Sequence, residues 1–243
     1  MDPLIYTAVS GANRTLSQQQ ISANNLANAN TQGFRADLEQ ANSRQVTGTG
    51  FDTRYLVQGQ NGGVDMTPGS IHQTGRELDV AIQGNGLIAL QNGGREVYTR
   101  NGAIEIDPDG NLTVGGLPVL GDGGPIVLPP YSSVAIGRDG TITITPDDGD
   151  MSAAMDVDRI KLVDIPANQL NKNETGLLIS NNRAAARSEM VQVVGKHLES
   201  SNVSAITEMV STVSLNRQFE AQIKMMKAAE ELAQAGNKLL RNS

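Results

Sequence analysis

The sequence contains no cysteine and no tryptophan, and aromatic residues make up only 3% of its 243 residues. Without cysteine the chain can form no disulfide and offers no thiolate for catalysis or for a zinc site. The scarcity of aromatic side chains leaves any buried core to aliphatic residues. The two histidines, His72 and His197, lie in separate polar segments, so we expect neither to serve as a metal ligand or a general base.

Long apolar runs are also missing. None reaches the roughly 18 residues that a membrane-spanning helix needs, so we expect no membrane insertion. The first residues lack the basic stretch and the apolar stretch of a cleavable secretory signal. From the residues alone, the chain is therefore expected to be cytoplasmic.

Charge is unevenly distributed along the chain, whose formal net charge is −7. The acidic excess lies in residues 76–165, where the balance is −8, whereas residues 1–75 carry −1 and residues 166–243 carry +2. An acidic chain is a poor general ligand for nucleic acid, so we expect no nucleic-acid partner. The nearly neutral ends can pack against copies of themselves without much like-charge repulsion.

A long helix is predicted at the N-terminal end of the chain. Asp2 and Pro3 supply an N-cap and a first helical position. Side chains then recur at alternating spacings of four and three residues, which is the pattern of a heptad seam with one polar member. The members of this predicted seam are Ile5, Val9, Ala12, Leu16, Gln19, Ala23 and Leu26. The pattern ends in the asparagine-rich residues 23–34, which indicates a junction with a defined geometry.

A second long helix is predicted from Val203 to about Leu240, with N-cap candidates at residues 200–202. It carries two apolar stripes, and the pattern leaves open whether the polar residues between them are a shift of the stripe or a polar contact built into it. The first stripe is Ile206, Val210 and Val213, the second is Phe219, Ile223, Met226, Ala229 and Ala233, and Asn216, Arg217 and Glu220 lie between them.

The middle of the chain has a different pattern of apolar and turn-forming residues. Between residues 76 and 165, short apolar runs alternate with turn sequences rich in glycine, asparagine and aspartate, which is typical of an all-β domain. Asp139-Gly140, between two such runs, predicts a tight hairpin. Residues 31–75 and 166–199 show no sustained period, so we interpret them as extended irregular arms. We expect the first arm to pack against other chains, because about forty structureless residues are unusual inside a compact domain.

Motifs with a superficial likeness to ligand sites have simpler interpretations. The Gly-Asn-Gly sequence of residues 84–86 lacks the third glycine of a nucleotide loop, so we expect a turn. Asp107, Asp109 and Asn111 are spaced like half a calcium loop but lack its bidentate glutamate, so we expect a turn here too. We predict no enzyme activity, no metal and no cofactor. The rival class is a secreted β-rich binding protein or a carbohydrate-active enzyme, which would need a concave site with paired carboxylates.

Three stretches resemble the flagellar axial proteins of bacteria, the family of rod, hook and hook-associated subunits. The first is the asparagine-rich residues 23–34. The second comprises residues 79–86, 98–102 and 116–121, although Leu87-Ile88 stands where the family pattern often has two aromatic residues. The third comprises residues 199–203 and 217–220. The matches occur in the family's order and extend over most of the chain.

The resemblance implies a function and a location. Within the family, the first six residues, the modest length and the C-terminal sequence are most similar to the proximal rod proteins, with distal rod proteins or another axial subunit as the alternative. It implies a structural subunit of the flagellar basal-body rod that polymerises through its terminal helices into the axial drive shaft. It also implies export without a cleaved signal. The implied location is therefore the periplasmic portion of the rod, not the cytoplasm. The implied partners are other copies of the chain, other proximal and distal rod proteins and, in transit, the flagellar type III export apparatus.

The expected fold class is α+β: a central all-β domain flanked by long N- and C-terminal helices that pair or pack in a coiled-coil-like tube, joined by extended irregular arms. We expect an N-terminal helix of the inner tube at residues 1–30, an extended arm at 31–75, and the β domain at 76–165. A returning arm at 166–199 and the C-terminal helix of the inner tube at 200–243 follow.

The two terminal signatures are expected to carry assembly. On the N-terminal side the residues are Ile5, Val9, Ala12, Leu16, Asn24, Asn25, Leu26, Asn28, Asn30, Thr31, Gly33 and Phe34. On the C-terminal side they are Ser201, Asn202, Val203, Ile206, Val210, Val213, Arg217, Phe219 and Glu220. We further expect residues 28–33 to turn the chain out of the tube and Phe34 to anchor the following arm on a neighbouring subunit.

Overall fold

The computed structural model describes residues 3–45, 55–147, 154–173, 175–181 and 184–241. The chain divides into two compact units. The first, here called the helical unit, consists of residues 1–27, 37–62 and 204–243. The second, here called the β unit, consists of residues 28–36 and 63–203. The chain therefore passes between the units four times, and the helical unit is assembled from three separate segments.

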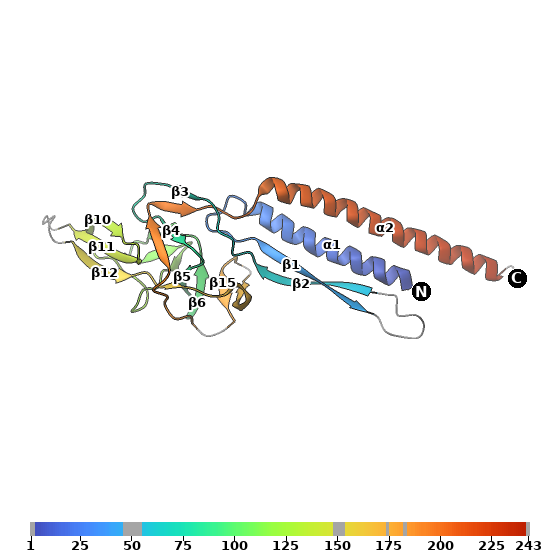
Figure 1. Cartoon of the computed structure of the whole chain (residues 1–243), viewed down its shortest axis with the longest axis horizontal. Helices are drawn as coiled ribbons and strands as arrows, with labels where there is room; N and C mark the ends of the chain where they lie inside the picture. The colour runs from blue at the N-terminus through green and yellow to red at the C-terminus, as the bar shows by residue number, and fades with distance from the viewer. Residues whose placement is uncertain (1–2, 46–54, 148–153, 174, 182–183, 242–243) are drawn as a thin grey trace. The chain divides into compact units, whose positions relative to one another are not determined.

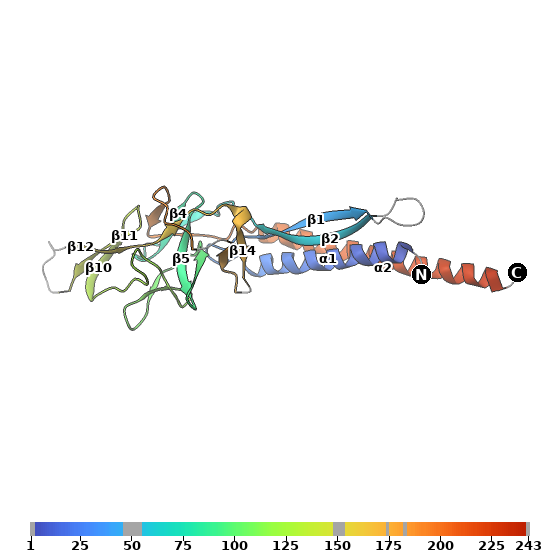
Figure 2. The same cartoon turned by 90° about the horizontal axis from the view of Figure 1, so that it is seen from below.

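Two helices and a hairpin form the helical unit. Helices α1 (Pro3–Ala27) and α2 (Ala205–Arg241) lie side by side, and the hairpin of β1 (Asp37–Gln45) and β2 (Tyr55–Val64) lies along α1 (Figures 1 and 2). Pro3 occupies the first turn of α1, where its missing N–H costs nothing. The N-cap of α2 is Ser204, whose hydroxyl accepts a hydrogen bond from the Thr207 N–H at 3.4 Å. The cap thus lies beyond the candidates at residues 200–202.

The predicted coiled-coil-like seam of α1 is wrong. The residues of α1 that are fully buried are small or polar: Ala8, Ala12, Thr15, Ser22 and Asn25. Of the predicted seam, Ala12 is buried, whereas Val9, Leu16 and Ala23 are exposed. The face turned toward α2 is therefore rotated from the predicted one, and polar side chains form much of it. Such a face does not provide the apolar a and d positions of a coiled coil.

The predicted irregular arm at residues 31–75 is also wrong, because β1, β2 and β3 (Ile71–Gln73) lie in it. Most side chains of β1 are exposed, so the strand lacks the apolar and polar alternation by which strands are recognised. Glycine allows its partner to pack closely, since a Cβ at Gly62 would lie 2.9 Å from the backbone nitrogen of Gln40.

The β unit contains several small sheets. Its sheets have the strand orders β13-β5-β6-β15-β14, β10-β11-β12, β7-β8-β9, β16-β4 and β17-β3. The strands not yet given are β4 (Val80–Gln83), β5 (Leu87–Asn92), β6 (Arg95–Thr99), β7 (Glu105–Ile106), β8 (Leu112–Val114), β9 (Leu117–Pro118), β10 (Tyr131–Ile136), β11 (Thr141–Pro146), β12 (Met155–Arg159), β13 (Leu162–Val163), β14 (Leu170–Lys172), β15 (Leu178–Ser180), β16 (Gln192–Gly195) and β17 (His197–Glu199), with a 3-10 helix at Ala167–Gln169.

The core of the β unit is aliphatic, as the scarcity of aromatic residues predicts. Its buried members come mainly from valine, leucine and isoleucine, with Tyr98 as the large aromatic exception. The hairpin predicted at Asp139-Gly140 is confirmed, because β10 and β11 pair antiparallel on either side of it. The turns predicted at residues 84–86 and 107–111 are confirmed as well, with Gly84 and Gly110 at φ of +78° and +85°.

The predicted irregular return at residues 166–199 is wrong. These residues supply β14 and β15 to the five-stranded sheet, and β16 and β17 pair with β4 and β3. Val193 and Leu198 are buried, so the segment contributes to the buried core of the β unit. The fold class is corrected accordingly: among the described residues, the chain is a multi-sheet β structure with two helices, and the connecting arms are themselves strands.

Candidate assembly site

Residues 28–33 form a compact turn. The Thr31 N–H donates to the Asn28 carbonyl at 3.1 Å, and the Thr31 hydroxyl donates to the Asn28 side chain at 3.1 Å. Gly33 has a φ of +65°, which disfavours residues with a Cβ. A Cβ there would lie 2.3 Å from the carbonyl carbon of Arg100, so this position also needs glycine for space. Residues 28–33 therefore form a turn, as expected, and its role in leading the chain out of a tube of helices stays a prediction.

Phe34 follows the turn and is buried within its own β unit, with only 8% of the residue exposed. The ammonium of Lys172 lies 3.7 Å from the centre of its ring, in a cation–π contact. The same ammonium donates to the Arg35 carbonyl at 2.7 Å. Direct anchoring of Phe34 on a neighbouring subunit is therefore wrong, because the chain's own residues already cover the ring.

A buried charge cluster lies next to Phe34. Glu199 Oε1 accepts from Arg35 Nη2 at 2.5 Å, and Glu199 Oε2 pairs with Arg100 Nη2 at 2.7 Å and Nε at 2.9 Å. All three side chains are at most 1% exposed. The Gly69 N–H adds a bond to Glu199 Oε1 at 2.8 Å. Burial lowers the pKa of Arg100 from its ordinary value, and the Glu199 carboxylate opposes this by stabilising the charged form. We call Arg35, Arg100 and Glu199 the charge cluster.

Asn202 ties two segments of the β unit together. Its side-chain oxygen accepts from the Ala36 N–H at 2.8 Å, and its side-chain nitrogen donates to the carbonyls of Asp65 and Thr67 at 2.9 and 3.1 Å. Its own N–H donates to the Phe34 carbonyl at 3.3 Å. The N-terminal and C-terminal signatures thus meet here in one network of hydrogen bonds.

A second polar network joins α1 to α2 inside the helical unit. The Ser22 hydroxyl donates to a carboxylate oxygen of Glu208, and the Asn25 amide donates to Glu208 at 3.4 Å. Asn25 also caps the start of β1, because its oxygen accepts from the Asp37 N–H at 2.9 Å. Further along the pair, Gln19 donates to Asn216 at 2.7 Å. The interruption around Asn216 in the apolar pattern of α2 is therefore a polar contact built into the helix interface.

The predicted assembly residues separate into an inward group and an outward group. Those buried or half-buried within the chain are Ile5, Ala12, Asn25, Leu26, Asn28, Gly33, Phe34, Ser201, Asn202, Val203 and Phe219. Those exposed are Val9, Leu16, Asn24, Asn30, Thr31, Ile206, Val210, Val213, Arg217 and Glu220. Among the outward group, Ile206, Val210 and Val213 lie together with exposed Met209 on α2, and we call these four residues the outer stripe.

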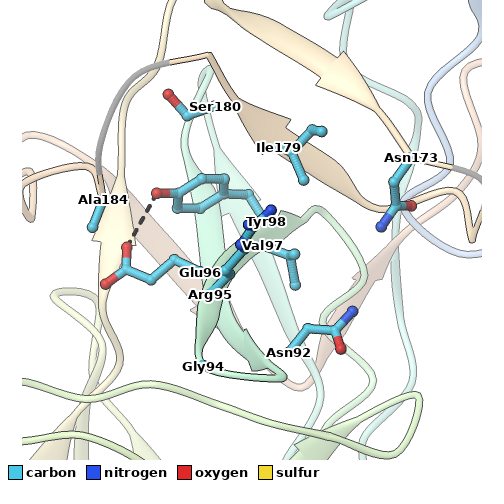
Figure 3. Close-up of a pocket in the computed structure, with 10 residues that line it drawn as sticks. All are labelled: Asn92, Gly94, Arg95, Glu96, Val97, Tyr98, Asn173, Ile179, Ser180 and Ala184. Atoms are coloured by element: carbon cyan, nitrogen blue, oxygen red, sulfur yellow. Dashed lines mark hydrogen bonds between the residues drawn. The ribbon is translucent and has the colours of Figure 1, made fainter.

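A separate pocket lies in the β unit, where β6 and β15 share only the register pair Tyr98 and Leu178. Its volume is about 780 Å³, and Figure 3 shows the Glu96 and Tyr98 side chains meeting at its wall. The Tyr98 hydroxyl donates to Glu96 at 3.1 Å, and Lys161 donates to the same carboxylate at 2.5 Å. Burial raises the pKa of Tyr98. Glu96 is the single carboxylate among the described lining residues, so they do not supply the paired carboxylates that glycoside hydrolysis uses.

Within the described parts of the chain, no group of three or more acidic or histidine side chains is arranged to hold a metal ion. Asp107 instead accepts hydrogen bonds from the Asp109 and Asn111 backbone and from the Asn111 side chain, and this last bond is the main cause of its lowered pKa. Neither of the described helices is long and apolar enough to span a membrane.

Family models match three parts of the chain in order. Residues 5–35 match a model described as flagella basal body rod protein. Residues 81–144 match the flagellar hook protein FlgE/F/G D1 domain, and residues 194–239 match the C-terminal model of the flagellar basal body rod FlgEFG proteins. The flagellar basal-body rod proteins FlgF of Escherichia coli K12 and of Salmonella typhimurium LT2 are each 40% identical to this chain, with 99% of both chains aligned.

The chain belongs to the flagellar basal-body rod protein family. The resemblance drawn from the sequence motifs is thus confirmed. The flagellar basal-body rod protein FlgG of Bacillus subtilis 168 aligns over 95% of this chain at 28% identity. The FlgF proteins of Escherichia coli and Salmonella typhimurium are thus more similar to this chain than this FlgG protein is.

Several residues that organise this rod-family chain were not among the predicted site residues. Arg35, Arg100, Lys172 and Glu199 hold the segment after the asparagine run, and Glu208 holds the helix pair. Arg100 and Glu199 lie inside the motifs that resemble the family, which is the one sequence signal that pointed to them. Nothing in local periodicity distinguishes a buried arginine from a solvated one.

Proposed function

We propose that this chain is a structural subunit of the flagellar basal-body rod that polymerises through α1 and α2. The observation that carries the proposal is the outer stripe, where Ile206, Met209, Val210 and Val213 are 76%, 54%, 66% and 52% exposed. Single exposed apolar residues are ordinary, but a continuous apolar stripe on a helix marks a surface that a partner covers. The stripe borders a shallow hollow of about 340 Å³ that Ser214 and Arg217 complete.

The outer stripe can supply substantial association energy. A fully buried valine, isoleucine or methionine side chain contributes about 1.5–3 kcal/mol relative to an exposed one. Scaled by the exposed fractions, covering the stripe contributes on the order of 5 kcal/mol to one contact. The stripe is available while α2 is already paired with α1, so a partner can bind it without unfolding the helical unit.

The proposal extends to partners and location. The partners are other copies of the chain and other rod proteins, with the flagellar export apparatus as a partner in transit. The location is the periplasmic portion of the basal body, reached without cleavage of a signal peptide. The chain has no catalytic role in this proposal: the helical unit makes the intersubunit contacts, and the charge cluster and Asn202 hold the β unit in shape.

The test is a matched pair of charge insertions on α2. Val213→Asp places a carboxylate in the outer stripe, whereas Gln218→Asp makes the same charge change at an exposed position outside the stripe. We expect Val213→Asp to weaken polymerisation at least tenfold in sedimentation experiments and to abolish complementation of motility in a strain lacking the chain. Gln218→Asp should behave like the unaltered protein. Normal assembly of Val213→Asp, with an unchanged thermal transition, would refute the proposed use of the stripe.

A further inference from the structure

The pocket of the β unit opens where two strands of one sheet part from each other (Figure 3). Strand β15 pairs with β6 through Leu178 and Tyr98 alone, and its next two residues, Ile179 and Ser180, continue in register with β14. The residues of β6 before Tyr98 line the pocket. The pocket therefore lies along an edge of β6, and we call it the strand-edge pocket.

The backbone groups of Glu96 are directed toward this edge. Ala89 of β5 lies opposite Tyr98, but its N–H donates to the Lys161 carbonyl at 3.0 Å and its carbonyl accepts from the Leu120 N–H at 3.0 Å. Ala89 and Tyr98 are thus not hydrogen-bonded to each other, and the Tyr98 backbone groups turn toward β15. Two residues along the strand, those of Glu96 turn the same way, past the point where the described ladder with β15 ends.

The size of the strand-edge pocket suits a short length of extended chain. One strand residue occupies roughly 160 Å³, from about 3.3 Å along the strand, about 4.8 Å between strands and about 10 Å between packed layers. The pocket volume of about 780 Å³ therefore accepts about five such residues. An open strand edge is a template for pairing with another chain, and proteins normally cover it.

The side chains beside the edge differ in polarity from one position to the next. Val97 is buried, and Ile179 falls on the same side of the sheet, because Leu178 pairs with Tyr98 on the other side. Arg95, two positions from Val97, shares this side as well, is exposed and forms no ion pair with the described residues. An added strand would therefore place an apolar side chain beside Val97 and, two positions away, an acidic one beside Arg95.

The opposite side of the edge offers no free charge and no aromatic face. The carboxylate of Glu96 is neutralised by Lys161 at 2.5 Å. Tyr98 is the one aromatic residue of the described lining, and it is 1% exposed. Its hydroxyl is already used, because it donates to Glu96 and accepts from the Ala185 N–H at 2.9 Å. The pocket thus gives a flat ring or a sugar no surface on which to stack, whereas it gives an extended backbone a strand to pair with.

We propose that the strand-edge pocket binds an extended segment of a partner protein, which adds a strand to β6 and carries an apolar and an acidic side chain two positions apart. The segment's backbone pairs with Glu96, its apolar side chain contacts Val97 and Ile179, and its acidic side chain pairs with Arg95. In recognition by strand addition, main-chain hydrogen bonds supply affinity and the alternate side chains supply specificity. The inference does not rest on the proposed function, because it uses residues of the β unit alone.

Labelled peptides test the proposal on the full-length protein by fluorescence anisotropy. The probes are Thr-Val-Thr-Asp-Thr and Thr-Asp-Thr-Val-Thr, which place the two side chains in both possible orders. We expect one order to bind, and its analogue with proline at the centre to bind at least tenfold more weakly, because proline has no N–H to donate to the strand. Equal binding of the proline analogue would overturn the proposal. So would failure of both orders at millimolar concentration, whether or not the neutral sugar cellotetraose binds.

A charge reversal supplies the second readout. Arg95→Glu should weaken binding of the aspartate peptide about fivefold or more and favour a peptide with lysine in place of aspartate. The control Arg138→Glu makes the same charge change at an exposed arginine outside the pocket and should leave both affinities unchanged. In the complex, the Glu96 amide should also gain protection from hydrogen exchange. Equal effects of the two variants, or an unprotected Glu96 amide in a saturated complex, would refute the proposed contact.

Discussion

Removal of the charge on Glu199 should be among the most damaging single substitutions in the β unit. Glu199→Gln keeps the shape of the side chain but leaves Arg35 and Arg100 without their counter-charge, and both are at most 1% exposed. Breaking a buried ion pair by removing one partner costs about 3–5 kcal/mol, because the remaining charge stays desolvated. Small proteins are stable by about 5–15 kcal/mol, so the variant should lose a large fraction of its free energy of unfolding.

The assay is urea unfolding followed by far-ultraviolet circular dichroism, with Asp122→Asn as the control. Asp122 pairs with Arg187 at 2.8 Å, but its side chain is 55% exposed, so its loss should cost less than about 1 kcal/mol. A further variant, Arg35→Met with Arg100→Met and Glu199→Leu, removes all three charges together. It should recover much of the lost stability, since no buried charge remains unpaired. If Glu199→Gln costs less than about 1 kcal/mol, the electrostatic account of the charge cluster is refuted.

Three other predictions concern single positions of the β unit, each measured by the urea midpoint. Gly33→Ala should destabilise the protein by more than about 2 kcal/mol, because it combines backbone strain with a contact of 2.3 Å. The control, Gly84→Ala, has a φ of +78° with open space around it, so backbone strain alone should destabilise it, by about 1 kcal/mol. Asn202→Ala removes three hydrogen bonds to backbone groups and should cost about 2–3 kcal/mol, with equal stability of the variant as the contrary outcome. The hydrogen bond from Thr141 lowers the pKa of Asp139, so its contribution is present above the unfolded pKa of about 4 and is lost as pH falls through the lower folded pKa. Asp139→Asn should therefore flatten the decline in stability below about pH 4, and an unchanged acid profile would contradict this account.

The sequence predicts the regular elements well where their period is strong. Alternating spacings of four and three residues identify both helices, and turn sequences such as Asp139-Gly140 locate the β hairpins. The hairpin of β1 and β2 was missed because its side chains are mostly polar and exposed, so neither face of the strand shows an apolar period.

The sequence did not predict which residues of α1 face α2, and it did not predict the charge cluster. The two failures have the same physical reason. Ser22 and Asn25 are polar and would ordinarily be assigned to solvent, yet Glu208, more than 180 positions away, makes their burial favourable. Arg35 and Glu199 likewise find each other across 164 positions. A polar residue is buried only when a distant partner satisfies it, and local sequence does not record which partner that is.

The helical unit is built from three separate segments, and this has a consequence for how the chain folds. Residues 1–27 cannot complete their packing until residues 204–243 arrive, because the polar side of α1 finds its partners there. Contacts between positions so far apart carry a large loop-closure cost and slow the folding reaction. A chain truncated before residue 199 lacks both α2 and the carboxylate that neutralises two arginines. A chain that ends early therefore leaves Arg35 and Arg100 without their counter-charge and cannot form the helical unit, so these C-terminal residues are needed before either unit is complete.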